Sequence, residues 1–151
     1  MNKKTILIII ALIAIIIVGF IAYNQFNNQK NQVTLENCVF TLPNGYHEGT
    51  SQNGEINITN GLNTLKIVKY NDNNVKKHVN DYKSYKEKSN YSISVSNFTV
   101  NNITIYKSNI VNDTNYLHYW FVYEGKVYSI STEDGNKNMD SIITELVRSI
   151  K

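Results

Sequence analysis

The sequence predicts an α+β domain with an antiparallel sheet of about six to seven strands and helices on both faces, preceded by one transmembrane helix. Three observations support this prediction. Residues 5–23 form an apolar run without charge. The remaining chain alternates strand-like and helix-like patterns, with helical spacing near residues 73–88 and at the C-terminus. The segment 116–123 is apolar on both faces, which predicts a strand covered on both sides, as in a helix–sheet–helix sandwich.

Composition limits the possible classes of protein. The chain has 151 residues, of which 42% are apolar and 18% charged, with one Pro, one Cys and a formal net charge of +3. This excludes collagen, disulfide-stapled mini-proteins and zinc ribbons. Lys3 and Lys4 account for two of the 15 basic residues, so the rest of the chain nearly balances its 12 acidic residues. We therefore expect no nucleic-acid partner.

Residues 5–23 (TILIIIALIAIIIVGFIAY) predict the membrane anchor. A helix of this length spans roughly 28 Å, which matches the hydrocarbon core of a bilayer. A cleaved signal peptide is the alternative, although its apolar region is usually shorter and precedes small residues. Lys3 and Lys4 favour a cytoplasmic location for residues 1–4. The expected localisation is the cell membrane, crossed once, with the C-terminal domain outside the cytoplasm.

Residues 24–34 are polar and without periodicity, which predicts a flexible stalk before an extracytoplasmic domain over 35–151. Within this domain two segments have helical spacing, 73–88 and 139–150. Alternating or β-branched patterns predict strands at 36–42, 55–59, 62–70, 91–100, 103–110, 116–123 and 126–132.

Turn residues predict how the strands connect. Leu42-Pro43-Asn44-Gly45 has Pro at the second position and Gly at the fourth, as in a type I turn, and a polar loop over 47–54 follows it. Asn60-Gly61 is a strong hairpin signal. The short connections at Asn101-Asn102 and Glu124-Gly125 predict an antiparallel meander of the last four strands.

Both helices are expected to cover the sheet. The first begins after a cap at Asp72 or Asn73, and its apolar stripe comprises Val75, Val79, Tyr82 and Tyr85. Its outer side is basic and is interpreted as a solvated face, with contact to anionic lipid as the alternative. The second helix, capped by Asn138 or Asp140, is strongly apolar. It is expected to cover the Leu117 and Phe121 face of strand 116–123, and the first helix the opposite face.

Chemically active residues are sparse. His47, His78 and His118 occur without a metal-binding or catalytic spacing, and no phosphate-binding or nucleophile motif is present. The sequence therefore predicts no catalytic residue, no cofactor and no metal site. Tyr116, His118 and Trp120 share one strand face and are the candidates for ligand contact. The single Cys38 is expected to be buried in its strand.

Several segments resemble one protein family. These are Phe40-Thr41-Leu42-Pro43-Asn44-Gly45-Tyr46, the hairpin after it, the aromatic stretch HYWFVYEGKVYSIS over 118–131 and the closing Val147-Arg148-Ser149-Ile150. They resemble the PsbP-like superfamily, in which an early strand runs into a Pro-x-Gly-aromatic turn and the last helix often ends in Ser and an apolar residue. The chain has Tyr46 where Trp is common. The resemblance implies a non-catalytic binding or assembly module and identifies no partner.

Two functional hypotheses follow. The first is a single-pass, membrane-anchored extracytoplasmic domain that binds or assembles components of the cell envelope, with an envelope protein or a glycan as partner. The second is an envelope hydrolase or a thiol/redox enzyme whose site is assembled from distant residues, such as His118 with a carboxylate, or Cys38.

Overall fold

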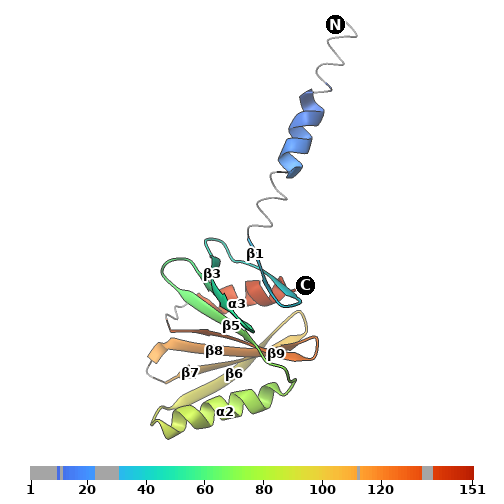
Figure 1. The fold of residues 1–151 in the computed structure, drawn as a ribbon. Coiled ribbons are helices and arrows are strands. Elements are labelled where there is room, and N and C mark those ends of the chain that lie inside the picture. Colours follow the sequence, from blue (N-terminus) through green and yellow to red (C-terminus); the bar gives the residue numbers. More distant parts are fainter. Residues whose placement is uncertain (1–9, 11, 23–30, 112, 134–137) are drawn as a thin grey trace, which may run out of the picture. The chain divides into compact units, whose positions relative to one another are not determined.

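The computed structural model describes residues 10, 12–22, 31–111, 113–133 and 138–151 (Figure 1). The chain divides into two compact units, Met1–Gln32 and Val33–Lys151. In the first unit, residues 10 and 12–22 are helical. No helix among the described residues combines the length and apolar character that crossing a membrane requires. The anchor predicted over 5–23 includes residues 5–9, 11 and 23, which lie outside the described residues.

The second unit is built on one antiparallel sheet of seven strands, as the sequence predicted. The strand order is β3-β4-β5-β9-β8-β7-β6. The bounds of these strands are β3 (His47–Gln52), β4 (Glu55–Thr59), β5 (Thr64–Lys69), β6 (Ile93–Val100), β7 (Ile103–Ile110), β8 (Asp113–Tyr123) and β9 (Lys126–Thr132). The predicted meander is confirmed, because β6, β7, β8 and β9 pair successively. Asn101 and Asn102 both have positive φ (47° and 65°), as a tight hairpin turn requires.

The strand predicted over 36–42 is shorter in the structure and lies outside the seven-stranded sheet. The structure has a separate hairpin of β1 (Gln32–Leu35) and β2 (Cys38–Thr41), with Glu36 at φ 54° in the turn between them. Every second side chain of each strand is buried, Val33 and Leu35 on β1 and Cys38 and Phe40 on β2, so both strands turn one face to the core. Residues 32–34, expected in the stalk, therefore belong to β1, and residues 24–30 of that stalk lie outside the described residues.

The prediction of a polar loop over 47–54 is also wrong, because this segment contains the edge strand β3. All six residues of β3 are exposed, so no apolar alternation marks the strand in the sequence. Asn53-Gly54 links β3 to β4, with Gln52 opposite Glu55. The preceding turn is shifted by one residue from the prediction. Tyr46 N donates to Pro43 O at 3.0 Å, and Gly45 has φ 84° at the third position, where type II turns need a positive φ.

The two helices cover opposite faces of the sheet, as predicted (Figure 1). α3 (Met139–Arg148) packs in a core with Leu117, Tyr119 and Phe121, which also contains the β1–β2 hairpin. Beyond α3, Thr41 N donates to Ser149 Oγ at 2.9 Å. Lys151 and Val39 exchange two backbone hydrogen bonds, of 3.1 and 3.2 Å. The end of the chain is therefore bonded to β2.

α2 (Val75–Lys88) packs on the other face, in a cluster of Val79, Trp120 and Val127. Its N-cap is Asn74, whose side chain accepts from Lys77 N at 3.1 Å, rather than the predicted Asp72 or Asn73. α2 contacts chiefly β8, β7 and β6. Thr64 and Lys66 on β5, on the same sheet face, remain exposed. α2 thus covers only part of its face and leaves a boundary near β9.

Candidate functional site

A row of polar side chains crosses the sheet on the α2 side. Strand pairing places Ser108 opposite His118, and His118 opposite Ser131. Ser131 is in turn opposite Lys66, and Lys66 is opposite Asn57. Directly opposed residues of antiparallel strands share one sheet face, so these five side chains form one line, here called the polar row. Because a sheet face under a helix is normally apolar, such a line is unusual.

The polar row passes from a buried region to an exposed one. Ser108 is only 1% exposed, and its Oγ and the Nε2 of His118 are buried without a hydrogen-bond partner among the described residues. Ser131 is half-buried, and the side chain of Lys66 is 45% exposed. A buried polar atom without a partner costs about 1–3 kcal/mol. The fold therefore retains polar groups at this boundary where apolar ones would be more stable.

His118 is held by aromatic rings. Its imidazole stacks on Trp120 with ring centroids 3.9 Å apart and planes 7° apart. The Tyr82 ring of α2 contacts both, edge-on, at 4.8 and 5.1 Å. Burial lowers the pKa of His118 to about 3, and the charge of nearby Lys86 adds to this effect. His118 is therefore a neutral imidazole at physiological pH, and it can donate or accept a hydrogen bond.

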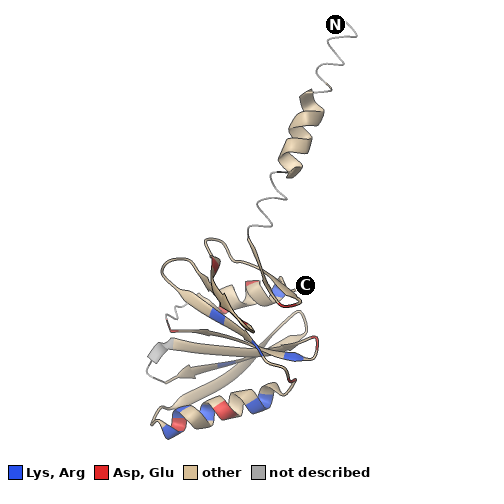
Figure 2. Cartoon of the chain, in the orientation of Figure 1, with Lys and Arg blue, Asp and Glu red and all other residues tan. Residues whose placement is uncertain are grey.

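Lys86 is the cation of this region. Its Nζ lies 5.5–5.9 Å from the ring centroids of Tyr82, Tyr85, Tyr91 and Tyr116. The negative faces of aromatic rings attract an ammonium group at such distances. Lys77 and Lys83 of the same helix instead pair with acidic residues four positions on, and Figure 2 shows these charges along α2. Lys86 has no carboxylate partner among the described residues, so its charge is directed to the tyrosine rings.

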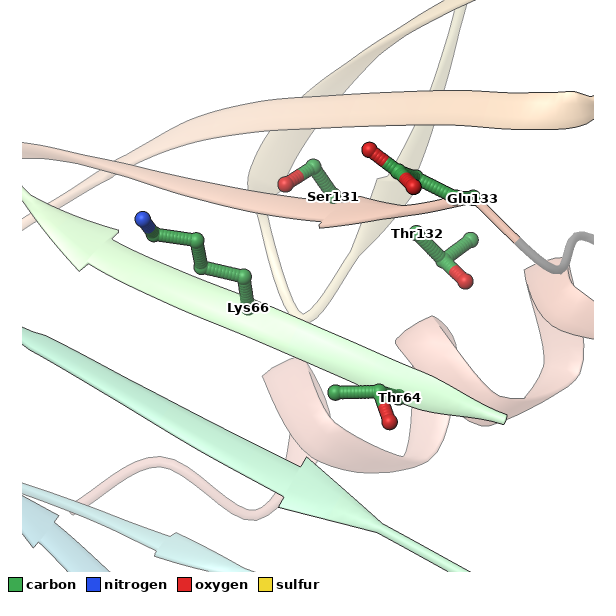
Figure 3. Close-up of a pocket in the computed structure, with 5 residues that line it drawn as sticks. All are labelled: Thr64, Lys66, Ser131, Thr132 and Glu133. Atoms are coloured by element: carbon green, nitrogen blue, oxygen red, sulfur yellow. The ribbon is translucent and has the colours of Figure 1, made fainter. Parts of the chain in front are cut away.

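These side chains line a hollow of about 170 Å³, here called the α2 groove. Tyr82 and Lys86 come from α2, and Tyr116, Leu117 and His118 come from β8. Ser131 and Thr132 come from the end of β9, and Glu133 is the residue after it. A second hollow of about 220 Å³ shares the last three residues and continues to Thr64 and Lys66 on β5 (Figure 3). The groove therefore continues along the exposed end of the polar row.

The predicted ligand contacts are placed differently by the structure. Tyr116 and His118 line the α2 groove, whereas Trp120 is 2% exposed and lies behind His118. The basic face predicted on α2 needs a correction at Lys86, which lines the groove. Tyr85, expected on the apolar stripe, is 66% exposed. Val79, Tyr82 and Lys86 share one face of a helix, because positions three and seven residues apart lie on the same side. This spacing would have indicated Lys86 in place of Tyr85.

The other histidines and the cysteine lie elsewhere. His78 Nε2 is 2.8 Å from Asp72 Oδ2 at the start of α2, and its ring contacts Tyr70 at 4.2 Å. This hydrogen bond and one from Asn74 N lower the pKa of Asp72. Cys38 is buried, as predicted, in the core on the α3 side, and burial raises the pKa of its thiol. No group of three or more possible metal ligands occurs among the described residues.

Comparison with known proteins gives likeness in fold only. No protein-family model matches the chain, and no curated protein matches it. A crystal structure from Bacteroides thetaiotaomicron VPI-5482 is 9% identical, with a TM-score of 0.45 over 81% of this chain and 48% of that one. The solution structure of cyanobacterial PsbP (CyanoP) from Synechocystis sp. PCC 6803 is 10% identical, with a TM-score of 0.48 over 76% and 85%.

A PsbP protein is among the structures that this chain resembles. The chain spans about half the length of the Bacteroides protein, 48%.

Proposed function

We propose that the chain is a single-pass, membrane-anchored protein whose extracytoplasmic domain binds a polar ligand of the cell envelope without catalysis. The observation that carries this proposal is the α2 groove. Tyrosine rings, the ammonium group of Lys86 and the exposed end of the polar row meet in it. Small-molecule sites typically combine an apolar or aromatic lining with a few directed polar groups.

The first unit supports the membrane part of the proposal. Its described helical residues are apolar and strongly exposed, with Ile15 at 67%, Ile16 at 69% and Val18 at 65%. A helix that is apolar all round is unfavourable in water and favourable in lipid. The uncharged run continues through residues 5–23, and Lys3 and Lys4 precede it. This charge pattern favours a domain on the extracytoplasmic side.

The groove also supports binding rather than catalysis. A hydrolase needs a nucleophile or water held by a base of suitable pKa, with the base itself oriented by a third group. Glu133 lines the groove together with His118, but His118 Nε2 has no hydrogen-bond partner among the described residues. Cys38 is buried in the core on the other side of the sheet.

Two measurements test the proposal. Protease added to intact cells should digest the domain and leave the anchor, and protection of the domain under a permeable wall would contradict the orientation.

For binding, the full chain in non-ionic detergent is titrated with wall-derived saccharides and peptides while Trp120 fluorescence is recorded. Trp120 is the single tryptophan and stacks on His118. A saturable change is expected, which Tyr116→Ala weakens and Lys83→Ala leaves unaltered.

The absence of any saturable binding, by fluorescence and by equilibrium dialysis, would contradict the binding function. Release of a cleaved product from any of these ligands at a rate that depends on His118 would contradict the non-catalytic part.

A further inference from the structure

The geometry points to a carboxylated sugar as the ligand of the α2 groove. This inference rests on the proposed binding function and names its ligand class. Each part of such a molecule has a matching feature in the groove: the carboxylate, the ring and the hydroxyl groups.

Lys86 is the group that would meet the carboxylate. Lys66, the other lysine of the two hollows, is paired with Glu55 at 2.7 Å. Lys86 has no such partner among the described residues, and the tyrosine rings hold its ammonium group at the groove. An ammonium–carboxylate contact away from bulk water is a strong, charge-assisted hydrogen bond. Glu133 at the same groove disfavours ligands of higher negative charge.

Tyr82 and Tyr116 are the groups that would contact the ring. Both line the groove, and both rings lie within 5.6 Å of Lys86 Nζ. The negative face of an aromatic ring favours the partly positive C–H groups of a sugar. The hollow of about 170 Å³ is smaller than the roughly 300–1,000 Å³ of pockets for drug-sized ligands. It therefore suits one ring, and the adjoining hollow can take the next residue of a chain.

The exposed end of the polar row, at Ser131 and Lys66, is the part that would meet the hydroxyls. A sugar hydroxyl both donates and accepts, so it needs partners that can do either. His118 is neutral because burial lowers its pKa, and Ser131 lies directly opposite it on β9. Because burial lowers the pKa of His118 to about 3, its ring is neutral from pH 5 to 8, and the positive charge at the α2 groove comes from Lys86. Recognition of the anion is therefore assigned to Lys86, and that of the hydroxyls to the polar row.

The test compares two sugars that differ in charge. The full chain in non-ionic detergent is titrated with sodium glucuronate and with glucose at constant ionic strength, by Trp120 fluorescence and equilibrium dialysis. Glucuronate should bind at least about tenfold more tightly than glucose. Lys86→Gln should remove this preference, because it should weaken the binding of glucuronate more than that of glucose. Lys86→Arg should keep it, and Lys83→Gln, on the same helix, should have no effect.

The outcomes separate the two proposals. Equal affinity for the two sugars, or an unchanged preference in Lys86→Gln, overturns the carboxylated-sugar inference. Binding of other envelope fragments would then leave the proposed function in place. Absence of binding by every saccharide and peptide overturns both. If Lys86→Gln unfolds, as judged by circular dichroism, Lys86→Arg and Tyr116→Ala decide. The inference is overturned if Lys86→Arg loses the preference or if Tyr116→Ala binds glucuronate unchanged.

Discussion

Tyr119 on β8 donates a 2.8 Å hydrogen bond to Asp140 in the first turn of α3. Lys107 on β7 binds the same carboxylate at 2.8–2.9 Å and lies 5.8 Å from the Tyr119 ring. A carboxylate in the first turn also interacts favourably with the helix dipole. These contacts fix the start of α3 on two adjacent strands, and burial together with this bond raises the pKa of Tyr119.

Removing the Tyr119 hydroxyl should destabilise the domain. Tyr119→Phe is expected to lower the free energy of unfolding by about 1.5–3 kcal/mol, because the bond is to a charged acceptor. Urea unfolding followed by circular dichroism measures this change. Tyr106→Phe is the control, since Tyr106 is partly buried on the other face and its hydroxyl has no hydrogen bond within the described part of the chain. Equal losses in the two variants would contradict the assigned role.

Removing the N-cap of α2 should lower the free energy of unfolding by a smaller amount. Asn74→Ala should cost about 1 kcal/mol, because the side chain accepts from Lys77 N. Asn73→Ala serves as the control, since Asn73 is exposed and lies one position outside the cap. Urea midpoints of the two variants are compared with that of the unmodified chain. The cap assignment fails if Asn73→Ala is the more destabilising of the two.

Truncating a side chain in the core under α3 should lower the free energy of unfolding by a large amount. Ile143 is fully buried in α3, so Ile143→Ala should lower the free energy of unfolding by about 2–5 kcal/mol through lost burial and the cavity left behind. Glu145→Ala, on the exposed side of the same helix, should change it by less than about 0.5 kcal/mol. A loss below about 1 kcal/mol for Ile143→Ala would contradict the packing of α3 on the sheet.

His118 predicts a pH dependence of stability. Its pKa in the folded state is about 3, against an ordinary 6.5, because burial disfavours the imidazolium ion. Below pH 6.5 the unfolded chain therefore takes up a proton that the folded chain does not. Stability should fall as pH decreases from about 6.5 towards 3, by up to about 1.4 kcal/mol per pH unit.

The variant His118→Phe isolates this effect. Urea unfolding at pH 7 and pH 5.5 avoids most carboxylate titration, and Lys86 and Glu133, which line the same groove, remain present in both proteins. His118→Phe should lose less stability between the two pH values than the unmodified chain. Equal losses of stability in the two proteins would show that His118 does not cause the pH dependence.

The predictable parts of the fold are those with local signals. Asn101-Asn102 and Glu124-Gly125 identified two turns, and the apolar spacing from Met139 to Ile150 identified α3. β3 has no apolar alternation, because all its residues are exposed. The turn residues Asn53-Gly54 are the one local sign of its hairpin. The groove could be predicted only in part. Tyr116 and His118 share a strand, but Ser131 and Lys66 join them only through the strand order β5-β9-β8. Lys86 joins them through the packing of α2 on β8.

The bonds between the end of the chain and β2 have a consequence for synthesis. α3 contacts β2, and Ser149 and Lys151 are bonded to Thr41 and Val39. A chain made from its N-terminus therefore exposes the apolar side of the β1–β2 hairpin until residue 151 is available. At about 5–20 residues per second, this interval lasts on the order of ten seconds. During it, Phe40 and its neighbours are accessible to chaperones or to other nascent chains.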